Sequence, residues 1–214
     1  MPAPQSHQST QSTQPQAFDV RRLSPHIGGE VTGLDLALPL APETFAALRK
    51  AWLEHQVLVF RDQKLTDDDQ VRFARYFGTP VGSRSMQQAN PHVMLISNIR
   101  ENGKVIGQLP DGELQFHADS VFLEKPLMGA ILHSVEVPAS GGNTKFASTY
   151  AACDALLARL WELCERPAHI YEHVWRVGDV IMWDNRCTQH ARTDFPEGER
   201  RLLRRVGIEG DKPY

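Results

Sequence analysis

The sequence predicts a single α+β domain whose core is a β-sandwich or barrel. Short strand-like apolar runs are spread along the chain, and helical spacing of apolar residues is strongest near its front. The 214 residues, of which 41% are hydrophobic and 23% charged, have the composition of one globular domain. No internal repeat interrupts this pattern.

The front of the chain is predicted to hold a tail, a helix and two strands. Residues 1–17 consist of Gln, Ser, Thr, Pro and similar residues and predict a disordered tail, with order beginning near Phe18. Residues 25–33 predict a turn and a short strand. Apolar residues at helical spacing predict a helix over 44–55, and the continuous apolar run 57–60 predicts a buried strand.

A second helix and two further strands are expected next. Thr66 and Asp69 have the spacing of a capping box, and Gly78 is the expected C-cap of the helix that follows. Residues 93–97 predict a strand, and residues 128–137 predict a longer one.

The last third of the chain is predicted to contain a helix and two strands. Apolar residues recur on one face over 149–163, which predicts a helix. Residues 180–183 predict a buried strand that ends in a polar cluster, and residues 200–209 predict a final strand rich in arginine.

Charge and cysteine content exclude several classes of protein. A net charge of −3 does not suggest a nucleic-acid-binding surface, and the apolar runs are too short to span a membrane. The first 17 residues lack the features of a secretory signal. Cys153, Cys164 and Cys187 are spaced unlike a zinc ribbon or a redox pair. We therefore expect a cytoplasmic protein with reduced thiols.

Three residues form a candidate metal site. His117 and Asp119 are two positions apart, so in an extended segment both side chains point to one face. This pattern alone is common by chance. His190 adds weight because it follows a predicted buried strand and a polar turn. Two histidines and one carboxylate are the facial triad of non-heme Fe(II) oxygenases.

Arginines near the end of the chain are candidate anion ligands. Arg201 and Arg205 are four positions apart, which places both on one face of the predicted last strand. A guanidinium pairs bidentately with a carboxylate such as that of a keto-diacid. The alternative is a solvated run of charges, because Glu197 and Glu199 are close in sequence.

The sequence resembles the TauD/TfdA family of Fe(II)- and 2-oxoglutarate-dependent dioxygenases from about Phe18 to its C-terminus. The motifs that carry the resemblance occur in the family's order, and each is weak alone. They are Ile27-Gly28-Gly29-Glu30-Val31-Thr32-Gly33-Leu34-Asp35-Leu36, Val57-Leu58-Val59-Phe60-Arg61-Asp62-Gln63, Phe116-His117-Ala118-Asp119, Gly141-Gly142-Asn143-Thr144, Trp183-Asp184-Asn185-Arg186 and Gly210-Asp211-Lys212-Pro213.

This resemblance implies a fold and an activity. The expected fold is a double-stranded β-helix, or jelly roll, with flanking helices, formed by residues 18–214. The expected reaction uses Fe(II), O₂ and the cosubstrate 2-oxoglutarate. It hydroxylates, and where the carbon bears a heteroatom thereby cleaves, a small anionic organic substrate, releasing succinate and CO₂. Association into a homo-oligomer is left open.

The resemblance also assigns roles to single residues. The three residues of the candidate metal site match the iron ligands. Thr144 and Arg201 match the residues that hold the distal carboxylate of 2-oxoglutarate, although a turn hydroxyl is the simpler interpretation of Thr144 taken alone. Arg205 matches an arginine that contacts an anionic group of the substrate. Its alternative is a salt bridge to Glu209 or to a surface acid.

Other interpretations remain beside this one. A zinc hydrolase could use the same three ligands, although it gives the arginines no role. A catalytically degenerate family member could bind a small acid without turnover. His169 and His173, four apart on a possible helix, are interpreted as surface histidines, and Trp175 as a core or interface residue.

One departure from the family pattern concerns chain length. His117 and His190 are 73 residues apart, where the family usually has about twice that separation. A segment is therefore missing near residues 155–160. Either the protein carries a deletion or the sequence joins two ordered stretches across a gap, and we favour the second. A true deletion predicts an incomplete barrel and doubtful activity.

Overall fold

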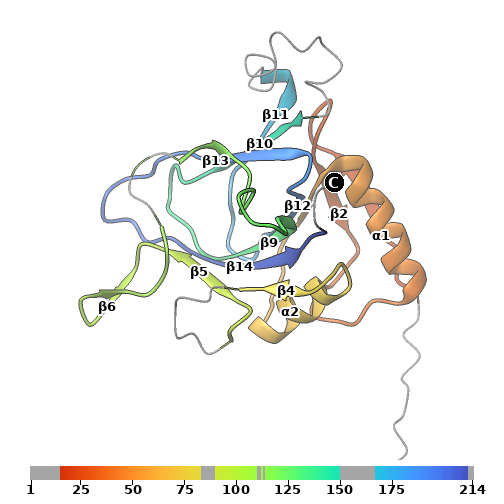
Figure 1. The fold of residues 1–214 in the computed structure, drawn as a ribbon, viewed down its shortest axis with the longest axis horizontal. Helices are drawn as coiled ribbons and strands as arrows, with labels where there is room; N and C mark the ends of the chain where they lie inside the picture. Colours follow the sequence, from red (N-terminus) through yellow and green to blue (C-terminus); the bar gives the residue numbers. More distant parts are fainter. Residues whose placement is uncertain (1–14, 83–89, 110–111, 113, 150–166, 212–214) are drawn as a thin grey trace, which may run out of the picture.

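The structure, a computed structural model, describes residues 15–82, 90–109, 112, 114–149 and 167–211. Figure 1 shows two β-sheets that face each other across the core. This is the arrangement of a jelly roll, as the sequence predicts. The predicted helix at 149–163 and most of the predicted tail at 1–17 lie outside the described residues.

The larger sheet is centred on the long strand β9. Its strand order is β1-β2-β3-β12-β9-β14-β4, and β5 also pairs with β14. All of its pairs are antiparallel except the parallel pair of β2 and β3. The strands are β1 (Asp19–Arg22), β2 (Gly29–Thr32), β3 (Val57–Phe60), β4 (Pro80–Val81), β5 (Met94–Ser97), β9 (Leu127–Glu136), β12 (Val180–Asp184) and β14 (Leu202–Glu209).

The smaller sheet has the order β11-β10-β13-β8. Its strands are β8 (Leu114–His117), β10 (Thr144–Ser148), β11 (Ile170–His173) and β13 (Thr188–Arg192). A separate hairpin is formed by β6 (Arg100–Glu101) and β7 (Lys104–Val105). Strands β10 and β11 pair directly, with Thr144 opposite His173.

Strand β3 separates two apolar clusters. Its side chains alternate, so that Leu58 and Phe60 belong to a cluster shared with the helices, and Val57 and Val59 belong to a cluster between the sheets. Burial on both faces explains why the run is apolar without alternation. Helix α1 (Pro42–His55) and helix α2 (Asp67–Arg75) contribute to the first cluster. No helix in the described ranges is long and apolar enough to cross a membrane.

The beginning of α2 follows the sequence prediction and its end does not. Thr66 accepts from the backbone N–H of Asp69 and the Asp69 carboxylate accepts from the Thr66 backbone, which completes the capping box. Gly78 is not the C-cap, because the helix ends at Arg75 and Tyr76 keeps a right-handed conformation. A Cβ on Gly78 would lie 2.9 Å from Cγ2 of Ile208, so its small size serves close packing against β14.

The prediction of two surface histidines on a helix is wrong for His173 and for the helix. His169 ends the short 3₁₀ helix η2 (Pro167–His169), whereas His173 ends strand β11. The His173 side chain is fully buried and its Nε2 lies 2.9 Å from Oδ2 of Asp179. Residues 170–173 form a strand here because β10 supplies the hydrogen-bonding edge.

Candidate active site

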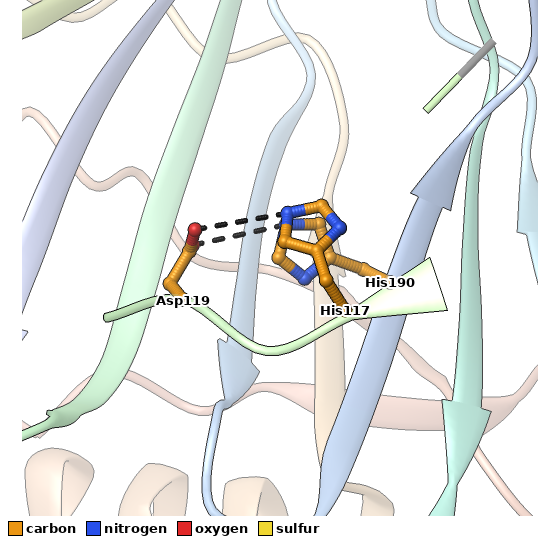
Figure 2. A group of neighbouring side chains, drawn as sticks. All are labelled: His117, Asp119 and His190. Atoms are coloured by element: carbon orange, nitrogen blue, oxygen red, sulfur yellow. Dashed lines mark ion pairs between the residues drawn. The ribbon is translucent and has the colours of Figure 1, made fainter. Parts of the chain in front are cut away.

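His117, Asp119 and His190 converge at one end of the smaller sheet (Figure 2). His117 is the last residue of β8 and Asp119 lies just beyond it, while His190 sits opposite His117 on β13. Nε2 of His117 is 3.9 Å from Oδ1 of Asp119, and Nε2 of His190 is 3.7 Å from Oδ2. The register of two paired strands therefore brings together side chains from two distant parts of the sequence.

This set of donor atoms fits a single metal ion. Two atoms bound to one ion at about 2.0–2.2 Å are at most about 4.4 Å apart. Both separations from Asp119 meet that limit, and the donor atoms of all three residues lie within 4.8 Å of one another. Burial lowers the pKa of His190 to about 3, which keeps its imidazole in the neutral form that binds metals. Nitrogen and carboxylate ligands in this ratio suit Fe(II).

Protein hydrogen bonds orient two of these ligands. Nδ1 of His117 lies 2.8 Å from the carbonyl of Gln115, which assigns the ring proton to Nδ1 and leaves Nε2 for a metal. The Asn185 side chain accepts from the backbone N–H of Asp119 at 2.9 Å and donates to the Asp119 carbonyl at 2.9 Å. Sequence reasoning assigned no role to Asn185, although this residue belongs to the polar cluster after a buried strand and to the motif Trp183-Asp184-Asn185-Arg186 that carries part of the resemblance.

A cavity of about 260 Å³ adjoins the three ligands. One part of its lining is apolar and the other part is cationic or hydroxylic. The apolar residues include Met94, Ile96, Leu109, Leu114, Leu132 and Trp183. Thr144, Arg201 and Arg205, all singled out from the sequence, line the same cavity. The fold thus brings every candidate site residue to one place.

Arg201 is a buried cation with unused donors. Its side chain is 1% exposed, and within the described ranges its Nε and Nη1 have no hydrogen-bond partner. Burial, and secondarily the charge of Arg192, lowers the pKa of Arg201 to about 9. It lies just before β14 rather than within that strand as predicted, with its backbone N–H bonded to Asn98. A buried guanidinium with unused donors costs folding stability, and an anion bound beside it would offset that cost.

Thr144 is brought to the cavity by a tight glycine turn. Gly141 and Gly142 both have positive φ values, of 72° and 63°. A Cβ on Gly141 would lie 2.2 Å from the Asp194 carbonyl, so only glycine allows this approach. Strand β10 then begins at Thr144, whose side chain is buried. Nε1 of Trp175, predicted only as a core or interface residue, donates to its hydroxyl at 3.1 Å.

Arg205 has a protein partner that sequence reasoning did not consider. Its Nη2 lies 2.7 Å from Oδ2 of Asp119, one of the candidate metal ligands. Within the described ranges this ion pair replaces the expected alternative, a salt bridge to Glu209 or to a surface acid. Burial lowers the pKa of Arg205, and the charge of Asp119 opposes this effect. Its Nε is buried and has no hydrogen-bond partner in the described part of the chain.

Comparison with known proteins gives a consistent set of relatives. The model of the family described as taurine catabolism dioxygenase TauD, TfdA family matches residues 19–159 and 153–206. A (S)-phenoxypropionate/alpha-ketoglutarate-dioxygenase of Sphingobium herbicidovorans is 26% identical and covers 91% of this chain and 96% of the relative. An alpha-ketoglutarate-dependent sulfate ester dioxygenase of Pseudomonas putida is 27% identical, covering 94% and 93%.

Solved structures give the same result. A taurine dioxygenase from Burkholderia xenovorans is similar with a TM-score of 0.78 and 27% identity, covering 91% of each chain. The fold is also that of AAD-2, solved with Mn(II) and N-oxalylglycine, with a TM-score of 0.82 and 24% identity over 92% of this chain and 99% of that one.

These alignments also locate a difference in length. The alignment with the Sphingobium protein runs over 285 residues, so at least 285 − 214 = 71 of its positions have no counterpart in this chain. The two matches to the family model meet at residues 153–159, between β10 and β11.

Proposed function

The chain belongs to the TauD, TfdA family of dioxygenases, and from this premise we propose that it hydroxylates a small anionic organic substrate with Fe(II), O₂ and 2-oxoglutarate, releasing succinate and CO₂. The observation that carries the proposal is Arg201, a buried guanidinium with unused donors in the same cavity as His117, Asp119 and His190. 2-Oxoglutarate is both a keto acid and a dicarboxylate, so the metal site would bind its keto acid end and the Arg201 guanidinium would bind its other carboxylate.

Each group of residues has a separate task in this proposal. His117, Asp119 and His190 hold the iron, which supplies activation of O₂ when bound. Arg201 and Thr144 bind the distal carboxylate of 2-oxoglutarate. The apolar part of the lining keeps water from the reacting groups, and it strengthens the ion pairs formed inside the cavity.

Arg205 is proposed to bind the anionic group of the substrate. Its Nη2 is engaged by Asp119, while its Nε has no partner in the described residues. One guanidinium can therefore keep the Asp119 carboxylate in place and still donate to a second anion. This arrangement would put the substrate beside the metal ligands, where its C–H bond must lie to react.

The substrate class follows from the two kinds of lining. An apolar surface that includes Met94, Ile96, Leu132 and Trp183 favours an organic group, and Arg205 favours a carboxylate, sulfonate or sulfate. Relatives named for phenoxypropionate and for sulfate esters agree with this combination. We infer that the protein works in the cytoplasm on a free small molecule, and not on nucleic acid or a membrane.

The test is succinate formation from 2-oxoglutarate with Fe(II) and O₂, across aryloxy carboxylates, alkyl sulfates and sulfonates. We expect one of these substrate classes to increase the rate of succinate release, with one succinate formed for each substrate molecule oxidised. A zinc hydrolase would instead cleave a substrate with Zn²⁺ and without succinate. The second candidate, a member that binds a small acid without turnover, is favoured by the 71 or more missing positions. It would bind 2-oxoglutarate and release no succinate with any substrate.

A further inference from the structure

We propose that Trp175 is a positioning residue that fixes the direction of the Thr144 hydroxyl, so that its proton points into the cavity beside Arg201. The inference rests on the proposed function, because it takes Thr144 as a ligand of the cosubstrate carboxylate. It adds a residue that never touches the ligand but determines how a ligand-binding group is presented.

The hydrogen bond between Trp175 and Thr144 has only one possible direction. Nε1 of Trp175 lies 3.1 Å from Oγ1 of Thr144, and the two residues are 7% and 4% exposed. An indole N–H can donate but cannot accept, so the Thr144 oxygen is the acceptor. The Thr144 hydroxyl proton must then point away from the indole, and it meets no protein acceptor in the described ranges. The residue lines the cavity, which leaves an anion in that cavity as the acceptor.

A buried polar network holds Trp175 in place. Its ring packs edge-on against the ring of His173, with centroids 4.7 Å apart and an interplanar angle of 79°. Nε2 of His173 lies 2.9 Å from Oδ2 of Asp179, which also receives Nη1 of Arg61 at 2.5 Å. The hydroxyl of Tyr171 lies 2.9 Å from Nδ1 of His173. Because His173 donates to the Asp179 carboxylate through Nε2, its Nδ1 accepts the Tyr171 proton.

This network makes the hydroxyl a fixed donor rather than a free rotor. Thr144 is opposite His173 in the pairing of β10 with β11, so the same strand pair carries both the hydroxyl and its support. A donor already aimed at the carboxylate loses no rotational freedom when the ligand binds. Without the indole donor the hydroxyl can occupy three staggered positions, so loss of its orientation corresponds to about 2- to 3-fold weaker binding.

The test substitutes the indole by a ring that cannot donate. Trp175→Phe keeps an aromatic ring and removes the N–H. We expect the Kd for 2-oxoglutarate, titrated anaerobically on the Fe(II) protein, to rise about 2- to 3-fold. The affinity for Mn(II) without 2-oxoglutarate should not change. Trp52→Phe is the matched control, since the buried Nε1 of Trp52 has no hydrogen-bond partner in the described residues and belongs to α1 outside the cavity.

A second residue separates orientation from packing. In a Thr144→Val background, which has no hydroxyl to orient, Trp175→Phe should cause no further loss of affinity. In a Thr144→Ser background, which keeps the hydroxyl, the loss should persist. Equal losses in the Val and Ser backgrounds, or an unchanged Kd in a folded Trp175→Phe protein, would show that Trp175 only fills space.

Hydrogen exchange of the indole N–H tests the Trp175–Thr144 hydrogen bond without 2-oxoglutarate, and so separates failure of this inference from failure of the proposed function. The indole N–H of Trp175 should exchange slowly in the ligand-free protein and faster in Thr144→Val. If the wild-type protein binds no 2-oxoglutarate, the proposed function and the positioning role are both overturned, even where slow exchange shows that the hydrogen bond itself exists.

Discussion

Replacing Arg201 by methionine should stabilise the ligand-free protein and abolish its response to 2-oxoglutarate. Arg201 is 1% exposed, and burial lowers its pKa from 12.5 to about 9. The lowered pKa means that the charged side chain is less favourable in the folded state than in the unfolded state. This cost is present at every pH below about 9, so it acts fully at pH 7.

The size of the effect follows from that pKa. A lowering from 12.5 to about 9 corresponds to about 5 kcal/mol, at about 1.4 kcal/mol for each tenfold change. Relaxation and water entry reduce such costs, so we expect Arg201→Met to raise the free energy of unfolding by about 1–3 kcal/mol. Loss of a bidentate contact in a desolvated site should weaken 2-oxoglutarate binding by about 2–5 kcal/mol, or roughly 30- to several-thousand-fold.

Urea unfolding with and without 2-oxoglutarate measures both effects. In the wild-type protein, ligand at 100 times its Kd should add about 2.7 kcal/mol, and in Arg201→Met it should add almost nothing at the same concentration. The control is Arg200→Met, which removes the neighbouring arginine, a largely exposed partner of Glu136. Its ligand response should equal that of the wild type. A destabilised Arg201→Met protein, or one that 2-oxoglutarate still stabilises normally, would refute the reasoning.

Three further predictions concern the metal ligands, the substrate arginine and a buried histidine. Alanine substitution of any one metal ligand, in His117→Ala, Asp119→Ala or His190→Ala, should abolish iron-dependent succinate formation and leave the circular dichroism spectrum unchanged. Activity in two of these three variants would contradict the assignment. Arg205→Ala should reduce substrate-triggered decarboxylation of 2-oxoglutarate while the slow uncoupled reaction persists, so equal loss of both would exclude a substrate-specific role. Burial lowers the pKa of His173 in the folded state. As the pH falls below 6.5, this side chain is therefore protonated in the unfolded state before it is protonated in the folded state. The free energy of unfolding should then decrease by up to about 1.4 kcal/mol per pH unit. Urea unfolding at pH 7, 6 and 5 should show a smaller fall in His173→Gln, and an identical fall would refute this origin.

Local patterns in the sequence predicted the elements that depend on near neighbours. The continuous apolar run 57–60 became a strand buried on both faces, and Thr66 capped α2 through an acid three residues away. Residues 128–137 predicted β9 to within one position at each end. The prediction for Gly78 was wrong because its small size is required by Ile208 on β14, a contact that no helix-ending pattern encodes.

The sequence by itself determined the chemical types of the candidate site, and tertiary structure decided how they are connected. Histidine, aspartate and arginine are residue types suited to a metal and an anion, and the ordered family motifs, rather than any one pattern, predicted a metal and an anion at these positions. The bond from Trp175 to Thr144 joins residues 31 apart, and that from Asn185 to Asp119 joins residues 66 apart. The pairing of Arg205 with Asp119 also depends on which strands are neighbours. None of these contacts joins two paired strands, because each involves at least one residue in a loop. They follow from how the two sheets face each other, which no single motif specifies.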